Sequence, residues 1–243
     1  MDVVTIDKHT NEILNGTRDL FGFNQQEHAG ICSAGSSLIG ALIVCYDTRK
    51  SLTTSANASG GQEASPSNWL IDEAQEKSVQ QWAEEKGIWV PNAEELLTKN
   101  YGPEIAQGVE SKVYYRTGDP SVIKLRASIY ATFGRALESI VLHNFFFPEA
   151  MMRVTGFTRT QDGLFRTILT QPYIECKRLA TKAEISKMIS SFNLGFTVID
   201  DGNQVNFQSE RYNLEDMHPA NVFIDMLSDK PICIDCIAKF KRL

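Results

Sequence analysis

The sequence lacks a hydrophobic run long enough to cross a membrane. Its most apolar stretch, LIGALIVCY (38–46), is far shorter than the roughly 20 residues that a spanning helix needs. The start, MDVVTIDKHTNE, has neither the basic segment nor the apolar segment of a signal peptide. We therefore expect a cytoplasmic protein with no membrane partner.

An excess of positive charge is also missing. The net charge is −6, whereas a nucleic-acid surface needs clustered Lys and Arg to meet phosphates. This balance disfavours nucleic acid as the main partner. Apolar residues make up 42% and charged residues 22% of the chain, a composition typical of globular domains rather than disordered ones.

Cysteine is sparse and odd in number. Five cysteines without a secretion signal indicate free thiols in a reducing compartment. Cys233 and Cys236 form a CxxC, but no second CxxC and no pair of histidines at ligand spacing accompanies them. Both lie in the apolar run PICIDCIA, so we expect structural thiols, with a zinc or redox site as the alternative.

A small-residue segment divides the chain. Residues 51–68, SLTTSANASGGQEASPSN, are too polar to offset their ordering entropy by burial, which predicts a flexible linker. Residues 1–50 would form a small N-terminal extension with strands, one of them at 38–46. Residues 69–243 would form the main domain.

The main domain mixes the periodicities of helices and strands. Apolar spacing predicts helices over 69–87, 92–100, 131–147 and 181–195. Alternation and turn signals predict strands over 111–115, 121–126, 151–159, 165–174, 196–200, 204–208, 221–225 and 232–236. This order predicts an α+β fold with two lobes.

A lysine stands in the middle of an apolar strand. Lys124 lies in SVIKLR, where an unpartnered ammonium would be costly. Glu138 is the only acid between Lys124 and the turn at Pro148, and it lies on the helix face of Leu137 and Val141. Such a pair suits a phosphate-positioning clamp. The alternative is an edge-strand lysine with a solvated head and an unrelated surface glutamate.

Oxygen donors crowd the stretch YNLEDMHPANVFID (212–225). Asp216 and Asn221 lie in a loop that runs into a short strand, and Asp235 lies on the second arm of the same expected hairpin. The three side chains would converge as oxygen ligands suited to Mg²⁺. His218 and Pro219 would stiffen the loop rather than catalyse. The alternative is a polar turn with Asp and Asn as local caps.

DMHPAN resembles the D-x-H-P-x-N catalytic loop of aminoglycoside- and choline-type phosphotransferases, within the protein-kinase-like superfamily. GVESKVYY is similar to the phosphate-covering hairpin, VIKL to the V-A-I-K strand and ALESIVLH to the helix with the partner glutamate. LTQPYIE resembles the strand before the hinge, and CIDC occupies the place of D-F-G. Over residues 69–243 the chain is most similar to the kinase domain of polyvalent proteins of bacterial phages and conjugative elements.

The resemblance implies ATP and Mg²⁺ as cofactors, an N-lobe over about 69–174 and a reduced C-lobe over about 175–243. It implies that Asp216 accepts the substrate's proton, that Lys124, oriented by Glu138, contacts phosphates, and that Asn221 and Asp235 hold Mg²⁺. The remaining implied ATP-binding residues are Gly108, Val109, Glu110, Ser111, Gln171, Tyr173 and Ile174.

Departures from the family pattern keep two other functions open. The chain has no GxGxxG, no glycine after Asp235-Cys236, and only the residues 236–243 beyond Asp235. A reduced C-lobe of this kind suggests a partner chain that completes it. We expect an ATP-dependent phosphotransferase with an unknown protein or small-molecule acceptor. The alternatives are a pseudokinase-like binding module and an interaction protein without a nucleotide site.

Overall fold

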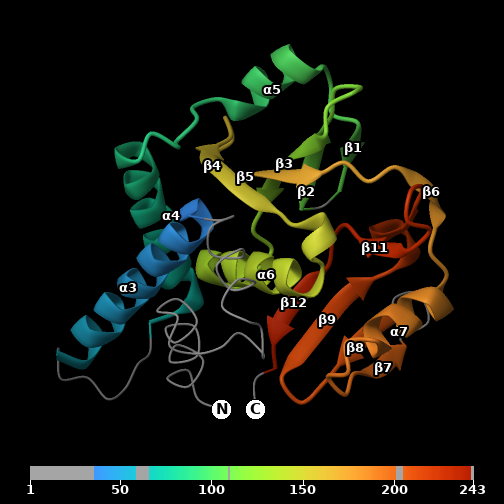
Figure 1. The fold of residues 1–243 in the computed structure, drawn as a ribbon. Coiled ribbons are helices and arrows are strands. Elements are labelled where there is room, and N and C mark those ends of the chain that lie inside the picture. Colours follow the sequence, from blue (N-terminus) through green and yellow to red (C-terminus); the bar gives the residue numbers. More distant parts are fainter. Residues whose placement is uncertain (1–35, 59–65, 109, 201–204, 242–243) are drawn as a thin grey trace. The chain divides into compact units, whose positions relative to one another are not determined.

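The computed structural model describes residues 36–58, 66–108, 110–200 and 205–241 (Figure 1). These residues form two compact units. The N-terminal unit contains residues 36–138 and 153–171, and the C-terminal unit contains residues 139–152 and 172–241. Antiparallel sheets and helices build both, which confirms the α+β fold. Within the ranges given, no helix is both long and apolar enough to cross a membrane.

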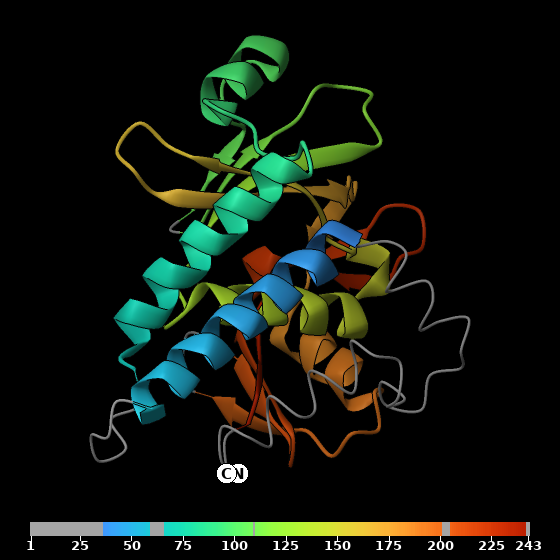
Figure 2. The same ribbon diagram turned by 90° about the vertical axis from the view of Figure 1, so that its left-hand side faces the viewer.

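Two helices, α3 (Ser36–Ala58) and α4 (Asn68–Glu85), lie side by side in the N-terminal unit (Figures 1 and 2). They approach closely at Gly40, where any Cβ would collide with the Trp82 ring. The buried Gln75 side chain donates to the Cys45 carbonyl at 2.8 Å and accepts from Gly134 N at 2.9 Å. This one amide joins both helices to the start of a third.

Helix α3 corrects two sequence expectations. The strand expected over 38–46 is wrong, because Leu38, Ala41, Leu42 and Cys45 are buried at helical spacing. Residues 51–58, expected to belong to a flexible linker, continue the helix. Thr48, Ser51, Thr53, Thr54 and Ser55 each donate to the carbonyl four residues earlier, so their hydroxyls bond within the helix.

The remainder of the linker expectation, residues 59–65, lies outside the part of the chain that the structure describes, as does the strand expected near the N-terminus. The division into an extension, a linker and a main domain therefore stays a prediction. Residues 36–58 belong to the same compact unit as α4, so this part of the expected extension has no separate core of its own.

A five-stranded sheet with the order β1-β2-β3-β5-β4 forms the other layer of the N-terminal unit. Its strands are β1 (Ala106–Gln107), β2 (Ser111–Tyr114), β3 (Ser121–Ala127), β4 (Arg153–Arg159) and β5 (Phe165–Pro172). Helix α5 (Ala93–Tyr101) packs on it through Ala93 and Leu97, against Tyr114, Leu125 and Ile168. Helix α6 (Phe133–Phe146) begins in this unit and ends in the other.

Two smaller antiparallel sheets build the C-terminal unit, with the orders β11-β10-β6 and β12-β9-β8-β7. Their strands are β6 (Cys176–Leu179), β7 (Thr197–Asp200), β8 (Val205–Gln208), β9 (Tyr212–Met217), β10 (Val222–Asp225), β11 (Pro231–Cys233) and β12 (Ile237–Phe240). Helix α7 (Lys182–Ser190) starts at a capping box of Thr181 and Glu184.

Aromatic side chains form the core of the C-terminal unit. Phe146 and Phe147 are buried, and both contact Phe192 at ring-centroid distances of 5.5 Å and 5.9 Å. Phe146 also packs edge-on against Tyr212 of β9 at 5.3 Å. These contacts fix the end of α6 to the strand that carries Asp216.

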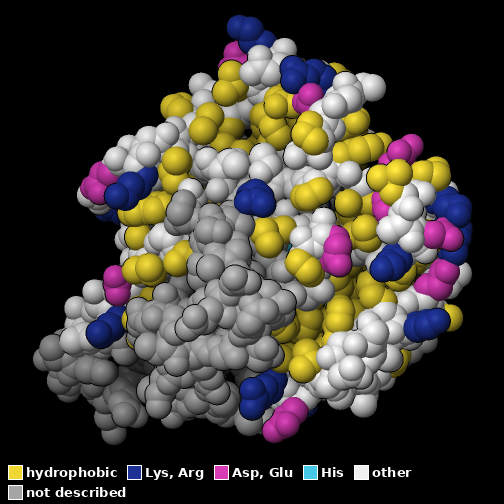
Figure 3. Space-filling model, viewed as in Figure 1, with side chains coloured by type: hydrophobic (Ala, Val, Ile, Leu, Met, Phe, Trp, Pro, Cys, Tyr) yellow, Lys and Arg dark blue, Asp and Glu magenta, His cyan; other side chains and the backbone are white. Residues whose placement is uncertain are grey.

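The strands that the sequence did not predict are β1, β6, β9 and β12. Each is short, and β6 is exposed along its length. In β9 the buried Tyr212 and Leu214 alternate with Asn213 and Glu215, so this strand carried a signal that the sequence analysis missed. Basic and acidic side chains are interspersed over the face in Figure 3.

Candidate active site

Strand register places two segments of the C-terminal unit side by side. Ile237 of β12 is paired with Glu215 of β9, and Cys233 of β11 is paired with Val222 of β10. The chain between β9 and β10 therefore runs antiparallel to the chain between β11 and β12. The first segment holds Asp216 and Asn221, and the second holds Asp235.

The link between the two segments is a backbone hydrogen bond. Ile234 N donates to the Asn221 carbonyl oxygen at 2.9 Å, which continues the β10–β11 register by one residue. Asp235 follows directly, before β12 begins. The convergence expected for Asp216, Asn221 and Asp235 at one end of the hairpin thus has a backbone basis.

Asp216 ends β9 in an unusual backbone conformation. Its φ is 60°, in the left-handed region that Asp and Asn tolerate better than other residues with side chains. Its backbone N–H donates to Asn206 Oδ1 at 3.1 Å. The side chain is 33% exposed, so its carboxylate remains accessible to a ligand. A strained, accessible acid of this kind is typical of functional sites.

Asn221 holds the Asp216 carboxylate in place. Its side-chain nitrogen donates to Asp216 Oδ2 and to the Asp216 carbonyl oxygen, both at 3.0 Å. Because that nitrogen is engaged, the amide oxygen Oδ1 is the atom left to accept from a donor or a cation. Carboxylate and amide oxygens are hard ligands of the kind that Mg²⁺ prefers, so the donor set fits this ion.

His218 and Pro219 shape the turn between these residues. The His218 ring nitrogen Nδ1 accepts from Ala220 N at 3.2 Å and caps the short 3₁₀ helix η2 (Pro219–Asn221). Its other nitrogen lies 3.5 Å from Asp216 Oδ1. The ring is therefore engaged with the turn itself, in agreement with the stiffening role expected from the sequence.

Lys124 lies on β3, the middle strand of the five-stranded sheet, opposite Val113 of β2. Only 4% of the residue is exposed. The alternative of an edge-strand lysine with a solvated head is therefore wrong. A buried ammonium must be met by polar groups, which is what a lysine positioned for phosphate contact also requires.

Glu138 on α6 is buried as well, at 9% exposure. Its Oε2 accepts from Arg135 at 2.5 Å, one helical turn earlier. The surface position considered for Glu138 is excluded by its burial. Sequence analysis missed Arg135, although the i,i+3 spacing on one helix is a recognisable signal.

The hairpin expected to cover phosphates joins β1 to β2. Gly108 N donates to the Ser111 carbonyl oxygen at 2.8 Å and closes the turn, in which Val109 lies outside the described residues. Glu110 forms an ion pair with the buried Arg126 at 2.8 Å. Since Arg126 follows Lys124 by two residues, both emerge on one face of β3. The carboxylate of Glu110 therefore anchors the turn to the strand of Lys124.

The segment expected to meet adenine, Gln171 to Ile174, spans the boundary between the two units. Gln171 is buried near the end of β5, and Tyr173 is 43% exposed beyond it. The boundary of the units falls between Gln171 and Pro172. The hinge that the family resemblance implies after LTQPYIE stays a prediction.

The CxxC has a partner that its sequence context did not reveal. The buried thiols of Cys233 and Cys236 lie near His143 of α6, with Cys236 Sγ 3.6 Å from His143 Nδ1. Burial raises the pKa of Cys233, whose thiol donates to the Asp235 carbonyl oxygen at 3.0 Å. His143 precedes the motif by about 90 residues, so spacing rules for local ligands gave no signal.

Other residues of the site also escaped the sequence analysis. Asn206 reaches Asp216 because the register of β8 against β9 shifts between Val205 and Phe207. Arg126 looked like the last residue of an apolar strand, yet it is buried and ion-paired. A register shift has no sequence signature of its own, and neither position belongs to a recognised motif.

Comparison with known proteins identifies a family for most of the chain. Residues 72–242 match the model of a family described as a serine/threonine/tyrosine kinase found in polyvalent proteins. No curated protein and no solved structure matches the chain significantly. The likeness to aminoglycoside- and choline-type phosphotransferases stays a prediction. Because the match covers well over half of the 243 residues, the chain belongs to the family of kinases found in polyvalent proteins.

Proposed function

We propose that the chain transfers the γ-phosphoryl group of Mg²⁺·ATP to a hydroxyl group of an acceptor. Membership of a kinase family supports phosphoryl transfer in general. The observation that carries the finer proposal is the Asp216–Asn221 pair. It holds an accessible carboxylate in a strained backbone conformation, beside the segment of Asp235.

Asp216 is the acceptor of the hydroxyl proton, or the group that orients this hydroxyl for attack. Phosphoryl transfer asks for little covalent work from the protein, so positioning and charge stabilisation dominate. The Asp216 carboxylate is held by the side-chain amide of Asn221, and one third of the Asp216 side chain is exposed. The carboxylate can therefore reach a substrate hydroxyl while it keeps its hydrogen bond to Asn221.

Asn221 Oδ1 and the Asp235 carboxylate are the proposed protein ligands of Mg²⁺. When bound, this ion supplies charge stabilisation to the phosphate oxygens. The side-chain nitrogen of Asn221 is held by Asp216, which turns the amide oxygen outward. Asp235 is placed by the hydrogen bond between Ile234 and Asn221.

Residues of the N-terminal unit are also proposed to bind the nucleotide. Lys124 is proposed to contact the α- and β-phosphates, with Glu138 as its orienting partner. The turn of Gly108, Val109, Glu110 and Ser111 would cover the phosphates, and backbone groups around Gln171, Tyr173 and Ile174 would meet adenine. The burial of Lys124 and Glu138 supports this role, because a buried charged group requires polar or charged partners.

A second function is favoured by one observation. Arg135 binds the Glu138 carboxylate at 2.5 Å, and a guanidinium there competes with the lysine ammonium for the same acid. A chain with that arrangement can bind nucleotide without transferring phosphate, as a pseudokinase-like module does. If the chain does transfer phosphate, its acceptor is proposed to be held partly by another chain.

The test is titration calorimetry of the purified chain with Mg²⁺·ATP, followed by an assay of ATP turnover. Binding that is lost in EDTA, together with slow metal-dependent turnover, is the expected result. Metal-dependent binding without turnover in the presence of candidate acceptors would favour the pseudokinase-like function. No binding by a folded sample would contradict both and leave an interaction protein.

A further inference from the structure

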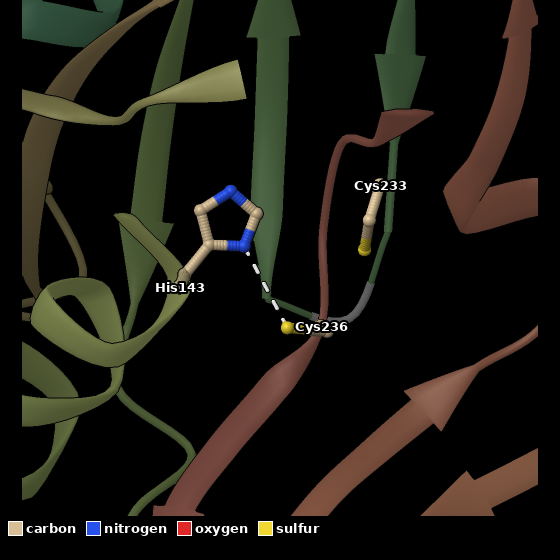
Figure 4. Close-up of side chains that lie close together, drawn as sticks. All are labelled: His143, Cys233 and Cys236. Atoms are coloured by element: carbon tan, nitrogen blue, oxygen red, sulfur yellow. Dashed lines mark hydrogen bonds between the residues drawn. The ribbon is translucent and has the colours of Figure 1, made fainter. Parts of the chain in front are cut away.

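A cluster of soft metal ligands lies in the core of the C-terminal unit. His143 comes from α6, Cys233 ends β11, and Cys236 directly precedes β12. One ligand atom from each lies within 4.8 Å of the others, and all three residues are buried. Figure 4 shows the Cys236 sulfur opposite a nitrogen of the His143 ring, with the Cys233 side chain nearby.

The distances match the edges of a tetrahedral metal site. With metal–nitrogen bonds near 2.0 Å and metal–sulfur bonds near 2.3 Å, tetrahedral ligands are separated by about 3.5 Å (N to S) and about 3.8 Å (S to S). His143 Nδ1 lies 3.6 Å from Cys236 Sγ. Cys233 Sγ lies 3.8 Å from the sulfur of Met217, a fully buried residue of β9. The three donors of His143, Cys233 and Cys236 therefore lie close together, and the Met217 sulfur is at ligand spacing from Cys233.

A hydrogen bond on the far side of the His143 ring selects its tautomer. Nε2 lies 3.1 Å from the Ala150 carbonyl oxygen, which can only accept. The proton is therefore on Nε2, and the lone pair of Nδ1 points toward Cys236. Metal-bound histidines use this arrangement regularly, because a carbonyl behind the ring fixes its orientation and raises its basicity.

We propose that His143 Nδ1, Cys233 Sγ and Cys236 Sγ, with the Met217 thioether as fourth donor, bind one thiophilic d¹⁰ cation, Cu⁺ or Zn²⁺. Thiolates and a thioether select such ions over Mg²⁺ or Ca²⁺, which prefer oxygen. Binding replaces the two thiol protons, which pass to solvent. No electron is transferred.

The position of the site gives the ion a structural consequence. Asp235 lies between the two cysteines, and Asp216 precedes Met217. A bound ion would therefore join α6 to both segments of the candidate active site through His143, the CxxC and Met217. This consequence does not depend on the proposed phosphoryl transfer, because the ion would stabilise the same segments in a chain without activity.

The first experiment measures metal binding by the full chain, purified with a reductant and freed of metal. Zn²⁺ is titrated against a chromogenic chelator, and Cu⁺ is titrated anaerobically against a Cu⁺-specific chelator. We expect one equivalent bound with a Kd below about 1 μM for at least one ion. The pair Cys233→Ser and Cys236→Ser should abolish this binding, whereas the matched control Cys176→Ser, at an exposed free thiol of the same unit, should retain it.

A second measurement uses the wild-type chain, so the proposal can be tested even if the double variant does not fold. In the wild-type chain, metal should slow alkylation of Cys233 and Cys236, read by mass spectrometry during mild denaturation. Cys45 is an internal control, because it is buried without belonging to the cluster. Equal protection of all three thiols would mean general stabilisation and would count against the site.

Met217 distinguishes the two ions. Met217→Leu preserves volume but removes the thioether, so Cu⁺ affinity should fall by at least about tenfold while Zn²⁺ affinity changes less. An unchanged Cu⁺ affinity would remove Met217 from the ligand set. The proposal as a whole is overturned if the folded wild-type chain binds neither ion stoichiometrically, or if the double serine variant binds as tightly as the wild type.

Discussion

The two units use ionised side chains in opposite ways. In the N-terminal unit, Lys124 and Arg126 are each 4% exposed and lie in the middle of a sheet. In the C-terminal unit, the side chain of Asp216 is 33% exposed. A buried charge contributes to the stability of the fold through its partner, because removal of that partner leaves an uncompensated buried ion. Partial exposure leaves a charge available to ligands. Variants at Arg126 should therefore lose stability, and variants at Asp216 should lose chemistry.

The largest effect should come from Asp216→Asn. Asn tolerates the positive φ of 60°, so the fold should remain while a carboxylate that accepts a proton is lost. We expect phosphoryl transfer to fall by about 10²–10⁴-fold, measured by turnover of ATP with Tm as the stability check. Asp229→Asn is the matched control, because Asp229 also has a positive φ, of 55°, in the same unit.

Equal turnover in Asp216→Asn and in the wild type would remove Asp216 from the chemistry. A large drop in Tm for Asp216→Asn, without one for Asp229→Asn, would break the contrast between the units. It would place Asp216 among the residues that hold the fold.

Asp235→Asn should weaken binding of Mg²⁺·ATP by on the order of tenfold, about 1.4 kcal/mol. The physical reason is the loss of one anionic oxygen from the cation's ligands. Calorimetry with Mg²⁺·ATP measures the effect, and ATP in EDTA serves as the control in which wild type and variant should agree. An unchanged dissociation constant would exclude Asp235 as a ligand.

Arg126→Met should reduce the free energy of unfolding by about 2 kcal/mol, because it leaves Glu110 without its ion pair in a largely buried position. Thermal and denaturant unfolding measure the change. The control is Lys177→Met, which breaks an exposed ion pair with Asp229, where the two side chains are 47% and 69% exposed. Exposed pairs contribute little, so a similar loss in both variants would contradict the role of burial.

The smallest effect concerns the pH dependence of α7. Hydrogen bonds from Arg178, and then from Thr181, hold the pKa of Glu184 well below its usual range. A lowered pKa stabilises the fold above the ordinary pKa of the group, and that contribution is lost as pH falls toward the folded-state value.

Glu184→Gln keeps the capping geometry but removes the charge. The stability difference between wild type and this variant should therefore be full at neutral pH and shrink below about pH 4. Urea unfolding across pH 3 to 7 tests the prediction. Glu149→Gln, at an exposed acid of the same unit, should show no such trend, and a constant difference for Glu184→Gln would contradict the account.

The sequence predicted most of the regular elements of the main domain. Helices α6 and α7 fall within the expected ranges, and α4 and α5 each extend one residue beyond theirs, because each helix has apolar residues at helical spacing or a clear cap. The failure at α3 is instructive. Its serines and threonines looked like linker residues, yet in the helix their hydroxyls bond to the preceding turn.

The candidate site likewise has features that the sequence predicted and features that it did not. The motif DMHPAN could be recognised in the sequence itself, since Asp, His and Asn at those spacings are typical of turns and functional sites. The support of Asp216 by Asn206 was not visible, because it depends on a register shift between strands. The ion pairs of Glu138 with Arg135 and of Glu110 with Arg126 also needed the folded chain to identify them.

By itself, the sequence determined the α+β class, the membership of a kinase family and the local order of the residues proposed for phosphate and metal, since periodicity and short motifs are properties of neighbouring residues. Only the tertiary structure decided that Lys124 is central rather than at an edge, and that His143 meets Cys233 and Cys236. The physical reason is that strand order, register and the packing of distant segments depend on contacts between residues that are far apart in the chain.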